Sequence, residues 1–435
     1  MKVSVIGAGL AGCEAAWTLA SSGIEVELYE MKPVKYSPAH TYSGFAELVC
    51  SNSLKAERTA SAAGLLKAEM RRLGSLLLDC ADKSRVPAGG ALAVDREDFS
   101  DLVTAAIKSH ANIKIISGEV EKLPQGNIII ATGPLTSGAL ASEIEKLLGG
   151  GYLSFYDAAA PIVTADSIDF EKVFRAARYG RGDDDYINCP FNKEEYDNFH
   201  SELISAESVQ LKSFETDAFK VYDGCMPVEV MAKRGEQTLR FGPLKPVGLR
   251  DPRTGNRPWA VVQLRAENDK GTLFNLVGFQ TNLKFAEQKR VFSMIPGLEK
   301  AEFTRFGVMH RNTFIDSPRL LNGDFSLKAN PDIYFAGQIT GVEGYMESAA
   351  SGIIAAKNML RKLQGRQRLM LPADTMTGAL STYILDSSVT DFQPMGANMG
   401  ILPPLPERIK SKQERYAAVA DRAIASLEAA LEEQG

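Results

Sequence analysis

The chain has 435 residues, of which 45% are hydrophobic and 24% are charged, and its formal net charge at pH 7 is −5. This composition is typical of globular proteins and excludes disordered and low-complexity classes, while the length predicts two or three domains. No apolar run approaches the roughly 18 residues of a membrane span, and the N-terminus lacks the pattern of a signal peptide. We therefore expect no membrane partner.

The five cysteines, at positions 13, 50, 80, 189 and 225, are an odd number, and no two have Cys-x-x-Cys spacing. This argues against a disulfide framework or a zinc site, so we predict no metal and a cytoplasmic location. Cys13 and Cys80 are expected to be small buried hydrophobes. The role of Cys189 is left open.

The first 30 residues follow the pattern strand, glycine-rich turn, helix, strand. Residues 3–7 are apolar and β-branched, residues 10–22 contain helix formers, and residues 24–30 alternate as a second strand. The turn, Gly7-Ala8-Gly9-Leu10-Ala11-Gly12, has the G-x-G-x-x-G spacing of a dinucleotide site. A purely structural glycine turn is the alternative.

Each residue of this motif has an expected role. Gly7 makes the tight turn, Gly9 lets the backbone approach a pyrophosphate, and Gly12 lets the helix pack closely on the strand. The helix N-terminus offers free N–H groups to the phosphates. Glu30, at the end of the second strand, suits a ribose hydroxyl and disfavours the 2′-phosphate of NADP at this site.

Two later segments favour FAD over NAD. Residues 127–133 and 332–337 are apolar strands that end in glycine. The loop 338–345 and a helix of small residues over 346–361 follow, which resembles the flavin-holding segment of two-dinucleotide-fold flavoproteins. An ordinary βα unit is the alternative. The predicted FAD-binding residues are Gly7, Ala8, Gly9, Gly12, Glu30, Ala131, Thr132, Gly133, Gly337, Gln338, Gly344 and Tyr345.

These segments predict an α/β fold with a discontinuous, Rossmann-like FAD-binding domain made of residues 1–158 and 296–370. Residues 159–295 are predicted to form an inserted α+β domain that binds substrate or RNA. Residues 371–435 are predicted to form a C-terminal segment with a terminal helix. The apolar stripe that predicts this helix is Tyr416, Ala420, Ala423, Leu427 and Leu431.

Two cysteines lie in contexts that suit reactive thiols. Polar residues after Cys50 predict a loop that runs into a helix, and a thiol at a helix N-terminus has a lowered pKa. Cys225 lies in a predicted tight turn between Gly224 and Pro227, with basic residues close by in sequence. For both cysteines a small buried hydrophobe is the alternative interpretation.

Residues 233–265 carry eight basic residues against two acidic ones, together with Phe241 and Trp259. Basic residues beside aromatic ones in a Pro- and Gly-rich loop suit a nucleic-acid backbone and an unstacked base, whereas a solvated basic loop is the alternative. His310 is a candidate to stack on a heterocycle, although a structural histidine is the alternative, and His200 is expected on a surface helix. The RNA-binding candidates are Lys233, Arg234, Lys245, Arg250, Arg253 and Arg257.

Eight motifs spread over the chain resemble those of the folate- and FAD-dependent tRNA (uracil-5-)-methyltransferase family, TrmFO. The first and the seventh are shared with the larger GidA-type tRNA-modifying flavoproteins, whereas the motifs around Cys50, Cys225 and Phe392 are more specific to TrmFO. The motifs are residues 7–16, 47–54, 86–96, 156–163, 224–235, 307–315, 336–345 and 392–400.

The resemblance implies that NADH or NADPH reduces FAD, and that the methylene carbon of 5,10-methylenetetrahydrofolate passes to C5 of the T-loop uridine of tRNA (position 54), giving 5-methyluridine. It implies that Cys225 is the nucleophile and that Cys50 takes the proton or holds the flavin adduct. His310 would stack on the pterin, residues 338–345 would line the flavin, and the basic strip 233–265 would take the T-arm.

Other functions stay open at this point. One is the same chemistry on a ribosomal RNA uridine, and another is a GidA-like modification of a wobble uridine. Further alternatives are a non-catalytic FAD- and RNA-binding protein and a plain flavin oxidoreductase. The choice between NADH and NADPH and the oligomeric state are not derivable from the sequence.

Overall fold

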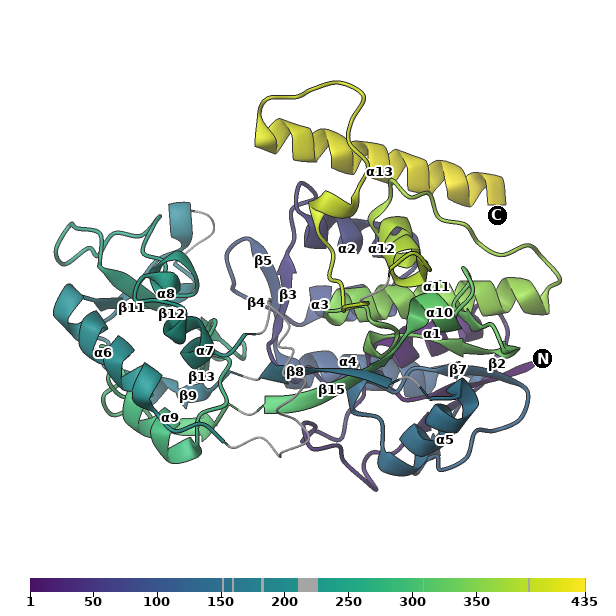
Figure 1. The fold of residues 1–435 in the computed structure, drawn as a ribbon, viewed down its shortest axis with the longest axis horizontal. Coiled ribbons are helices and arrows are strands. Elements are labelled where there is room, and N and C mark those ends of the chain that lie inside the picture. The colour runs from purple at the N-terminus through teal and green to yellow at the C-terminus, as the bar shows by residue number, and fades with distance from the viewer. Residues whose placement is uncertain are drawn as a thin grey trace.

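The computed structural model describes residues 1–150, 152–158, 160–180, 184–209, 226–307, 309–389 and 392–434, without the side chains of residues 152–158 and 309–311. Figure 1 shows two lobes, a larger one that holds both ends of the chain and a smaller one built from the middle of the chain. Each lobe has a six-stranded sheet and a hydrophobic core of its own.

The sheet of the larger lobe is mostly parallel, which confirms the predicted α/β class. Its central strands β1 and β7 are buried on both faces and are therefore largely apolar, as in Ile128–Ile130. Only β16 runs antiparallel to its neighbour. In spatial order the strands are β16 (Ser326–Leu327), β17 (Asn330–Phe335), β7 (Asn127–Ile130), β1 (Lys2–Ile6), β2 (Glu25–Glu30) and β6 (Ile113–Ser117).

Two helices that are far apart in sequence pack side by side on this sheet. They are α1 (Leu10–Ser21) and α11 (Tyr345–Leu363), and both match helices predicted from the sequence. A Cβ at Gly352 of α11 would collide with the carbonyl group of Ala11, so the small residues of α11 allow this close approach. The other helices of this lobe between β3 and β8 are α2 (Ala62–Arg72), α3 (Leu76–Lys83), α4 (Arg96–Ser109) and α5 (Gly138–Leu148).

The sheet of the smaller lobe is antiparallel. Its core contains several large aromatic side chains, among them Phe199, Phe279 and Phe292. The helices α6 (Lys193–Ser205), α7 (Val228–Lys233), α8 (Thr238–Phe241) and α9 (Phe285–Phe292) belong to this lobe. In spatial order the strands are β10 (Phe174–Arg175), β11 (Tyr186–Phe191), β12 (Ala260–Ala266), β13 (Leu273–Leu276), β9 (Ile162–Thr164) and β14 (Phe303–Arg305).

An antiparallel pair of strands, β8 (Tyr152–Ala158) and β15 (Met309–Ile315), carries the chain out to the smaller lobe and back (Figure 1). A three-stranded sheet of β3 (Ser53–Ala56), β5 (Ala91–Val94) and β4 (Arg85–Val86) lies between the lobes. The helix predicted after Cys50 is wrong, because residues 53–56 pair with β5 and α2 begins only at Ala62.

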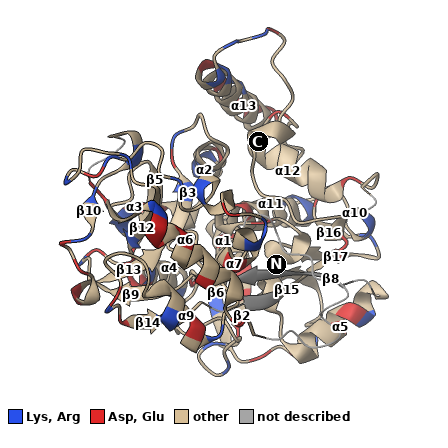
Figure 2. Ribbon diagram, turned by 60° about the vertical axis from the view of Figure 1, so that its left-hand side comes forward, with Lys and Arg blue, Asp and Glu red and all other residues tan. Residues whose placement is uncertain are grey.

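The C-terminal part of the chain packs on the larger lobe. It follows α11 and contains α12 (Met376–Leu385) and α13 (Lys412–Gln434), which lies over α2 and α12 (Figures 1 and 2). The short helix α10 (Ser317–Leu320) comes earlier, before β16. The predicted stripe of α13 is confirmed, since Ala420, Ala423 and Leu427 are fully buried. None of the described helices is long and apolar enough to span a membrane.

Candidate active site

A cavity of about 450 Å³ lies at the carboxyl ends of β1, β2 and β7. Ligand pockets in this position and size range are typical of open α/β sheets. All the predicted cofactor residues except Gly12 line this cavity, and Cys50 lines it as well. The structure therefore brings together residues near positions 7, 30, 50, 132 and 340.

The glycines of the first motif differ in their surroundings. Gly7 has a φ of 99°, and a Cβ there would lie 2.7 Å from the carbonyl oxygen of Ala131, so this turn requires glycine. A Cβ at Gly12 would collide with the carbonyl group of Gly7, so α1 packs directly on the turn. Gly9, the N-cap of α1, has open space at its Cβ position, and no side chain caps the helix at this end, which lies at the cavity wall.

Glu30 is held rigidly at the cavity wall. Its Oε2 accepts a hydrogen bond from the N–H of Ala8 at 2.8 Å, and its Oε1 accepts one from the N–H of Lys32 at 2.9 Å. The side chain is largely buried, with 8% exposed. Because a carboxylate has about four lone-pair sites, both oxygens retain acceptor capacity for hydroxyl groups.

The loop after β17 forms another wall of the cavity. Gly337 and Gly344 have φ values of 84° and 121°, and Nε2 of Gln338 donates to Oε2 of Glu343 at 2.6 Å. The conformation of this loop therefore depends on the two glycines and on an internal side-chain hydrogen bond.

The segment 392–400 supports this loop, a role that the sequence did not indicate. The N–H of Glu343 donates to the carbonyl oxygen of Met395 at 2.9 Å, and the N–H of Met395 donates to that of Gly341 at 3.0 Å. The ring of Phe392 lies so close to Gly341 that a Cβ there would be 2.5 Å from it.

Cys50 contacts the first residue of α11. Its Sγ lies 3.0 Å from the hydroxyl oxygen of Tyr345, and this oxygen accepts hydrogen bonds from the N–H groups of Cys50 at 2.8 Å and Ser51 at 3.2 Å. With both lone pairs used, the hydroxyl proton is directed to the sulfur. Burial and then Cys50 raise the pKa of Tyr345 well above its ordinary value, so the phenol keeps this proton.

Residues from both lobes hold the backbone around Cys50, and we call this set the Cys50 clamp: Arg96, Arg265, Glu267, Ser51 and Asn52. Arg96 Nη1 donates to the carbonyl oxygens preceding Cys50, at 2.6 and 2.9 Å, and its Nε pairs with Glu267 at 2.5 Å. Arg265 donates to Oδ1 of Asn52 at 2.9 Å and to Oγ of Ser51 at 2.7 Å. The smaller lobe therefore fixes the loop that carries Cys50.

The charged groups of the clamp act on one another. Burial by itself lowers the pKa of Arg96, but Glu267, Tyr345 and Cys50 outweigh it and leave the pKa above its ordinary value. Arg96 is therefore a permanent cation close to the Cys50 thiol, and it favours the thiolate form.

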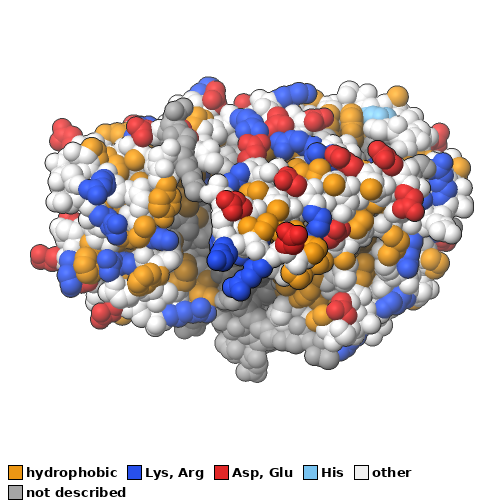
Figure 3. All heavy atoms as spheres, turned by 90° about the horizontal axis from the view of Figure 1, so that it is seen from above, with side chains coloured by type: hydrophobic (Ala, Val, Ile, Leu, Met, Phe, Trp, Pro, Cys, Tyr) orange, Lys and Arg blue, Asp and Glu red, His pale blue; other side chains and the backbone are white. Residues whose placement is uncertain are grey.

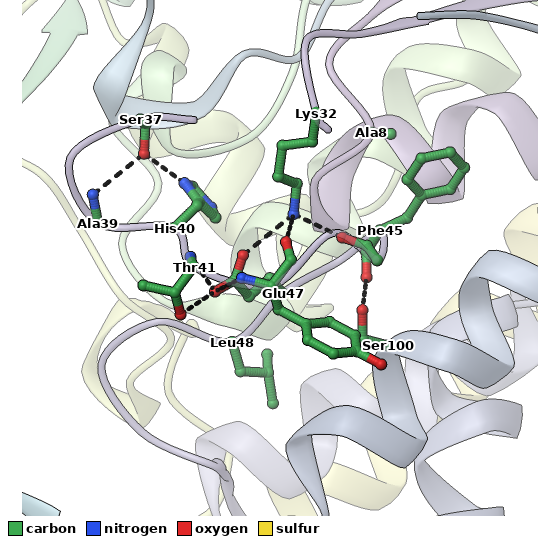
Figure 4. Close-up of polar contacts among 12 residues, drawn as sticks. Ala8, Lys32, Ser37, Ala39, His40, Thr41, Phe45, Glu47, Leu48 and Ser100 are labelled. Carbon is green, nitrogen blue, oxygen red and sulfur yellow. Dashed lines mark hydrogen bonds and ion pairs between the residues drawn. The ribbon is translucent and has the colours of Figure 1, made fainter. Parts of the chain in front are cut away.

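A buried ion pair shapes the chain between β2 and Cys50. Lys32 Nζ donates to the carbonyl oxygens of Tyr42 at 3.0 Å and Gly44 at 2.6 Å and pairs with Glu47 at 3.1 Å (Figure 4). The other carboxylate oxygen of Glu47 accepts from the N–H of Thr41 at 2.8 Å. Sequence reasoning missed this pair, because the segment has no periodicity that would show which charges are buried.

His40 lines the same wall, and its Nδ1 lies 2.5 Å from Oγ of Ser37 (Figure 4). Burial lowers the pKa of His40, which favours the neutral imidazole. His200, expected on a surface, is instead buried in the smaller lobe, where its Nε2 lies 3.0 Å from the carbonyl oxygen of Ala232. That expectation was wrong because α6 turns this face toward α7.

The remaining cysteines have different positions. Cys13 and Cys80 are buried, as expected, and Cys189 is fully buried in β11, where burial raises its pKa. Cys225 and the side chain of His310 lie outside the described residues. Within the ranges given above, no cluster of three His, Cys, Asp or Glu side chains is suited to hold a metal ion.

The predicted RNA-binding residues lie on the smaller lobe. All six are exposed, whereas the two other basic residues of the strip are buried or half-buried. Arg240 covers the ring of Trp259 at 3.6 Å from its centroid, and Arg265 belongs to the Cys50 clamp. Figure 2 shows basic residues on the loops near β10 and β12.

Comparisons with known proteins agree with this architecture. The family model for glucose inhibited division protein A, GIDA, matches residues 2–367. The solved structure of GidA from Aquifex aeolicus superimposes with a TM-score of 0.70 over 100% of this chain and 74% of that chain, at 17% sequence identity. At this identity the likeness concerns the fold alone.

Two curated relatives match nearly the whole chain, and both are named methylenetetrahydrofolate–tRNA-(uracil-5-)-methyltransferase TrmFO. The protein from Acetivibrio thermocellus is 60% identical over 423 residues, covering 97% of each chain. The protein from Desulfitobacterium hafniense is 60% identical over 427 residues, covering 98% of this chain and 97% of its own. The chain therefore belongs to the TrmFO family, within the wider GidA group.

Proposed function

We propose that this chain is a tRNA methyltransferase that transfers the methylene carbon of 5,10-methylenetetrahydrofolate to C5 of the T-loop uridine, with FAD as cofactor and NADH or NADPH as reductant. The observation that carries the proposal is the position of Cys50 on the wall of the cavity that also contains the dinucleotide motif. The full-length identity to the TrmFO relatives supports the same assignment.

The cavity residues fit FAD. The open position at Gly9 and the N-terminus of α1 would take the pyrophosphate, Glu30 would accept from the ribose hydroxyls, and the loop from Gly337 to Tyr345 would lie along the flavin. When bound, FAD would supply the redox chemistry that converts the methylene carbon of the folate into a methyl group.

The thiols would supply the chemistry on the uridine. Uracil C5 becomes nucleophilic when a nucleophile adds at C6, and a thiolate both adds to and leaves a conjugated acceptor readily. Cys225, outside the described residues, is proposed for this addition. The C5 proton must then be removed by a base, and Cys50 is proposed for that role.

The surroundings of Cys50 suit a thiolate. The Tyr345 hydroxyl donates to its sulfur, and Arg96 places a permanent positive charge nearby. Both groups stabilise negative charge on sulfur, and the thiolate is the form of the side chain that can accept a proton.

The basic residues of the smaller lobe would bind the RNA backbone. Lys233, Arg234, Lys245, Arg250, Arg253 and Arg257 are exposed and are proposed to contact T-arm phosphates. His310 is proposed to stack on the pterin, on the basis of sequence alone.

The test is a methylation assay with nucleoside analysis. Purified protein is incubated with NADH or NADPH, 5,10-methylenetetrahydrofolate and an unmodified tRNA transcript. We expect 5-methyluridine at the T-loop position, lost in Cys50→Ala and in Cys225→Ala but kept in the matched control Cys80→Ala. Product on ribosomal RNA fragments but not on tRNA, or no product on any RNA, would overturn the proposal.

A further inference from the structure

The smaller lobe contains a second cavity of about 640 Å³, away from the cofactor motifs. Its walls come from the chain after β10 and from the loop before β12. No acidic residue is present among the described lining residues, whereas Arg250 and Arg257 are, and both are exposed. The lining residues that matter here are Tyr179, Gly248, Arg250, Asn256 and Arg257.

Tyr179 lines this cavity, and 58% of its surface is exposed. Its backbone has φ 60° and ψ 23°, a left-handed conformation that costs a non-glycine residue free energy. Backbone strain of this kind at a non-glycine residue concentrates at functional sites.

The ring of Tyr179 is seated on Gly248. A Cβ at Gly248 would lie 2.9 to 3.0 Å from three ring carbons, and Gly248 itself has a φ of 88°. The N–H of Tyr179 donates to the carbonyl oxygen of Gly248 at 3.0 Å. Glycine is therefore required at 248 if the ring is to keep this position.

The neighbouring residue, Arg178, makes this seat rigid. Its guanidinium turns inward and donates to Oε1 of Gln263 at 2.7 Å, to the carbonyl oxygen of Val247 at 3.0 Å and to that of Lys245. Arg178 therefore anchors the loop under the ring to β12. Arg178 is half-buried by these contacts, whereas Tyr179 is exposed.

We propose that Tyr179 is a stacking platform for an unpaired base of the RNA substrate, with Arg250 and Arg257 on the flanking phosphates. The inference rests on the proposed function, which supplies the RNA. An exposed aromatic ring that is already fixed in place loses little entropy on stacking, and basic residues beside it match the backbone of a single-stranded segment. Figure 3 shows several Lys and Arg side chains on the lobe that carries this site.

The test measures binding of a fluorescently labelled, unmodified tRNA transcript to the FAD-containing protein. We expect Tyr179→Ala to weaken binding about 5- to 100-fold, the range found for loss of one stacked base, and Tyr179→Phe to bind within about twofold of the unchanged protein. Tyr179→Gly is the decisive variant, because glycine adopts the same backbone angles without strain and removes only the ring. Phe285→Ala, which removes a ring that is 53% exposed elsewhere on the lobe, is the control and should bind normally.

Salt dependence separates stacking from charge. The slope of log Kd against log salt should stay unchanged in Tyr179→Gly and should fall by about one in Arg250→Gln and in Arg257→Gln. Unchanged binding by both Tyr179→Gly and Tyr179→Ala, or an equal loss with Tyr179→Phe, would overturn the platform. If either of these overturning results is found while the unchanged protein methylates tRNA, only the stacking proposal is rejected. If the unchanged protein does not methylate tRNA, the proposed function is rejected.

Discussion

The contact between Cys50 and Tyr345 is the feature of the cavity that bears most directly on chemistry. The hydroxyl accepts from two main-chain N–H groups and directs its proton to the sulfur. Hydrogen bonds to a charged group contribute about 1.5–3 kcal/mol, so this bond would stabilise a thiolate at Cys50. Tyr345 is thus proposed as a positioning residue for Cys50.

Tyr345→Phe should therefore slow the alkylation of Cys50 by iodoacetamide near neutral pH, since the thiolate loses its hydrogen-bond donor. The measurement is the rate of iodoacetamide modification of the Cys50 peptide as a function of pH, followed by mass spectrometry. Tyr334→Phe is the matched control, because it removes another buried hydroxyl, one that bonds Asp324. A profile that does not move in Tyr345→Phe would show that the hydroxyl does not act on the thiol.

Glu14 predicts a pH dependence of stability. This fully buried carboxyl group accepts from the N–H groups of Leu76 at 3.0 Å and Leu77 at 3.2 Å at the start of α3, yet burial raises its pKa to about 7. A carboxyl whose pKa is raised by folding stabilises the folded state fully below pH 4.5, and this stability is lost as the pH rises through about 7.

Glu14→Gln removes that titration. As the pH rises from 5 to 8, the free energy of unfolding of the variant, measured relative to that of the unchanged protein, should increase by about 1–3 kcal/mol. Thermal melts of both proteins at several pH values measure this difference, in which the titration of all other groups cancels. If this difference instead decreased as the pH rises, the helix N–H groups would be stabilising the carboxylate form.

For single residues, the sequence predicted which ones line the cavity but not the contacts that hold their side chains in place. The glycine motif and the acid at its fixed spacing are local patterns, so Gly7, Gly9 and Glu30 could be placed without a structure. The contacts Lys32–Glu47 and Cys50–Tyr345 join residues that no local periodicity relates, and they follow only from the tertiary fold.

Among the contacts between secondary-structure elements, the Cys50 clamp is the one that positions the thiol. The end of β12 reaches from the smaller lobe to the loop before β3, and Arg265 makes two hydrogen bonds there while being almost completely buried. Arg96, at the start of α4, completes the arrangement from the larger lobe. The position of the thiol therefore depends on both lobes.

Arg265→Lys should lower kcat of methylation by about tenfold or more while leaving the FAD content unchanged. Lysine keeps the charge but cannot make the two fork-shaped hydrogen bonds, each of the charge-assisted kind. Steady-state methylation kinetics and the absorbance of bound flavin measure the two quantities. The control is Arg290→Lys, in an exposed ion-pair cluster on α9 of the same lobe. Equal kcat values for Arg265→Lys and the control would reject the clamp as a positioning device.

Elements with strong periodicity were predicted well, whereas those set by tertiary pairing were not. The strands β1, β2 and β7 and the helices α1, α11 and α13 lie where the sequence placed them. The strand β3 replaced a predicted helix because its pairing partner, β5, lies more than 30 residues away. The support that residues 392–400 give to the 337–345 loop is likewise a long-range contact.

The whole molecule places the cofactor motifs in one lobe and the exposed basic residues in the other. The strands β8 and β15 connect the lobes, and the main cavity takes residues from both sides, including Gln280 and Asn312. We propose that this arrangement brings the RNA bound by the smaller lobe to the thiols and the flavin. The sequence predicted the parallel-sheet class and an insertion, but not that the insertion would hold the Cys50 loop.

The most direct test of this account is the origin of the transferred carbon. The protein is incubated with unmodified tRNA, NADH or NADPH, and 5,10-methylenetetrahydrofolate labelled with ¹³C in the methylene group, and the digested nucleosides are analysed by mass spectrometry. We predict that the 5-methyluridine formed at the T-loop position carries the label in the wild-type protein and that no product forms in Cys50→Ala. Unlabelled 5-methyluridine, or an undiminished labelled product in Cys50→Ala, would contradict the account.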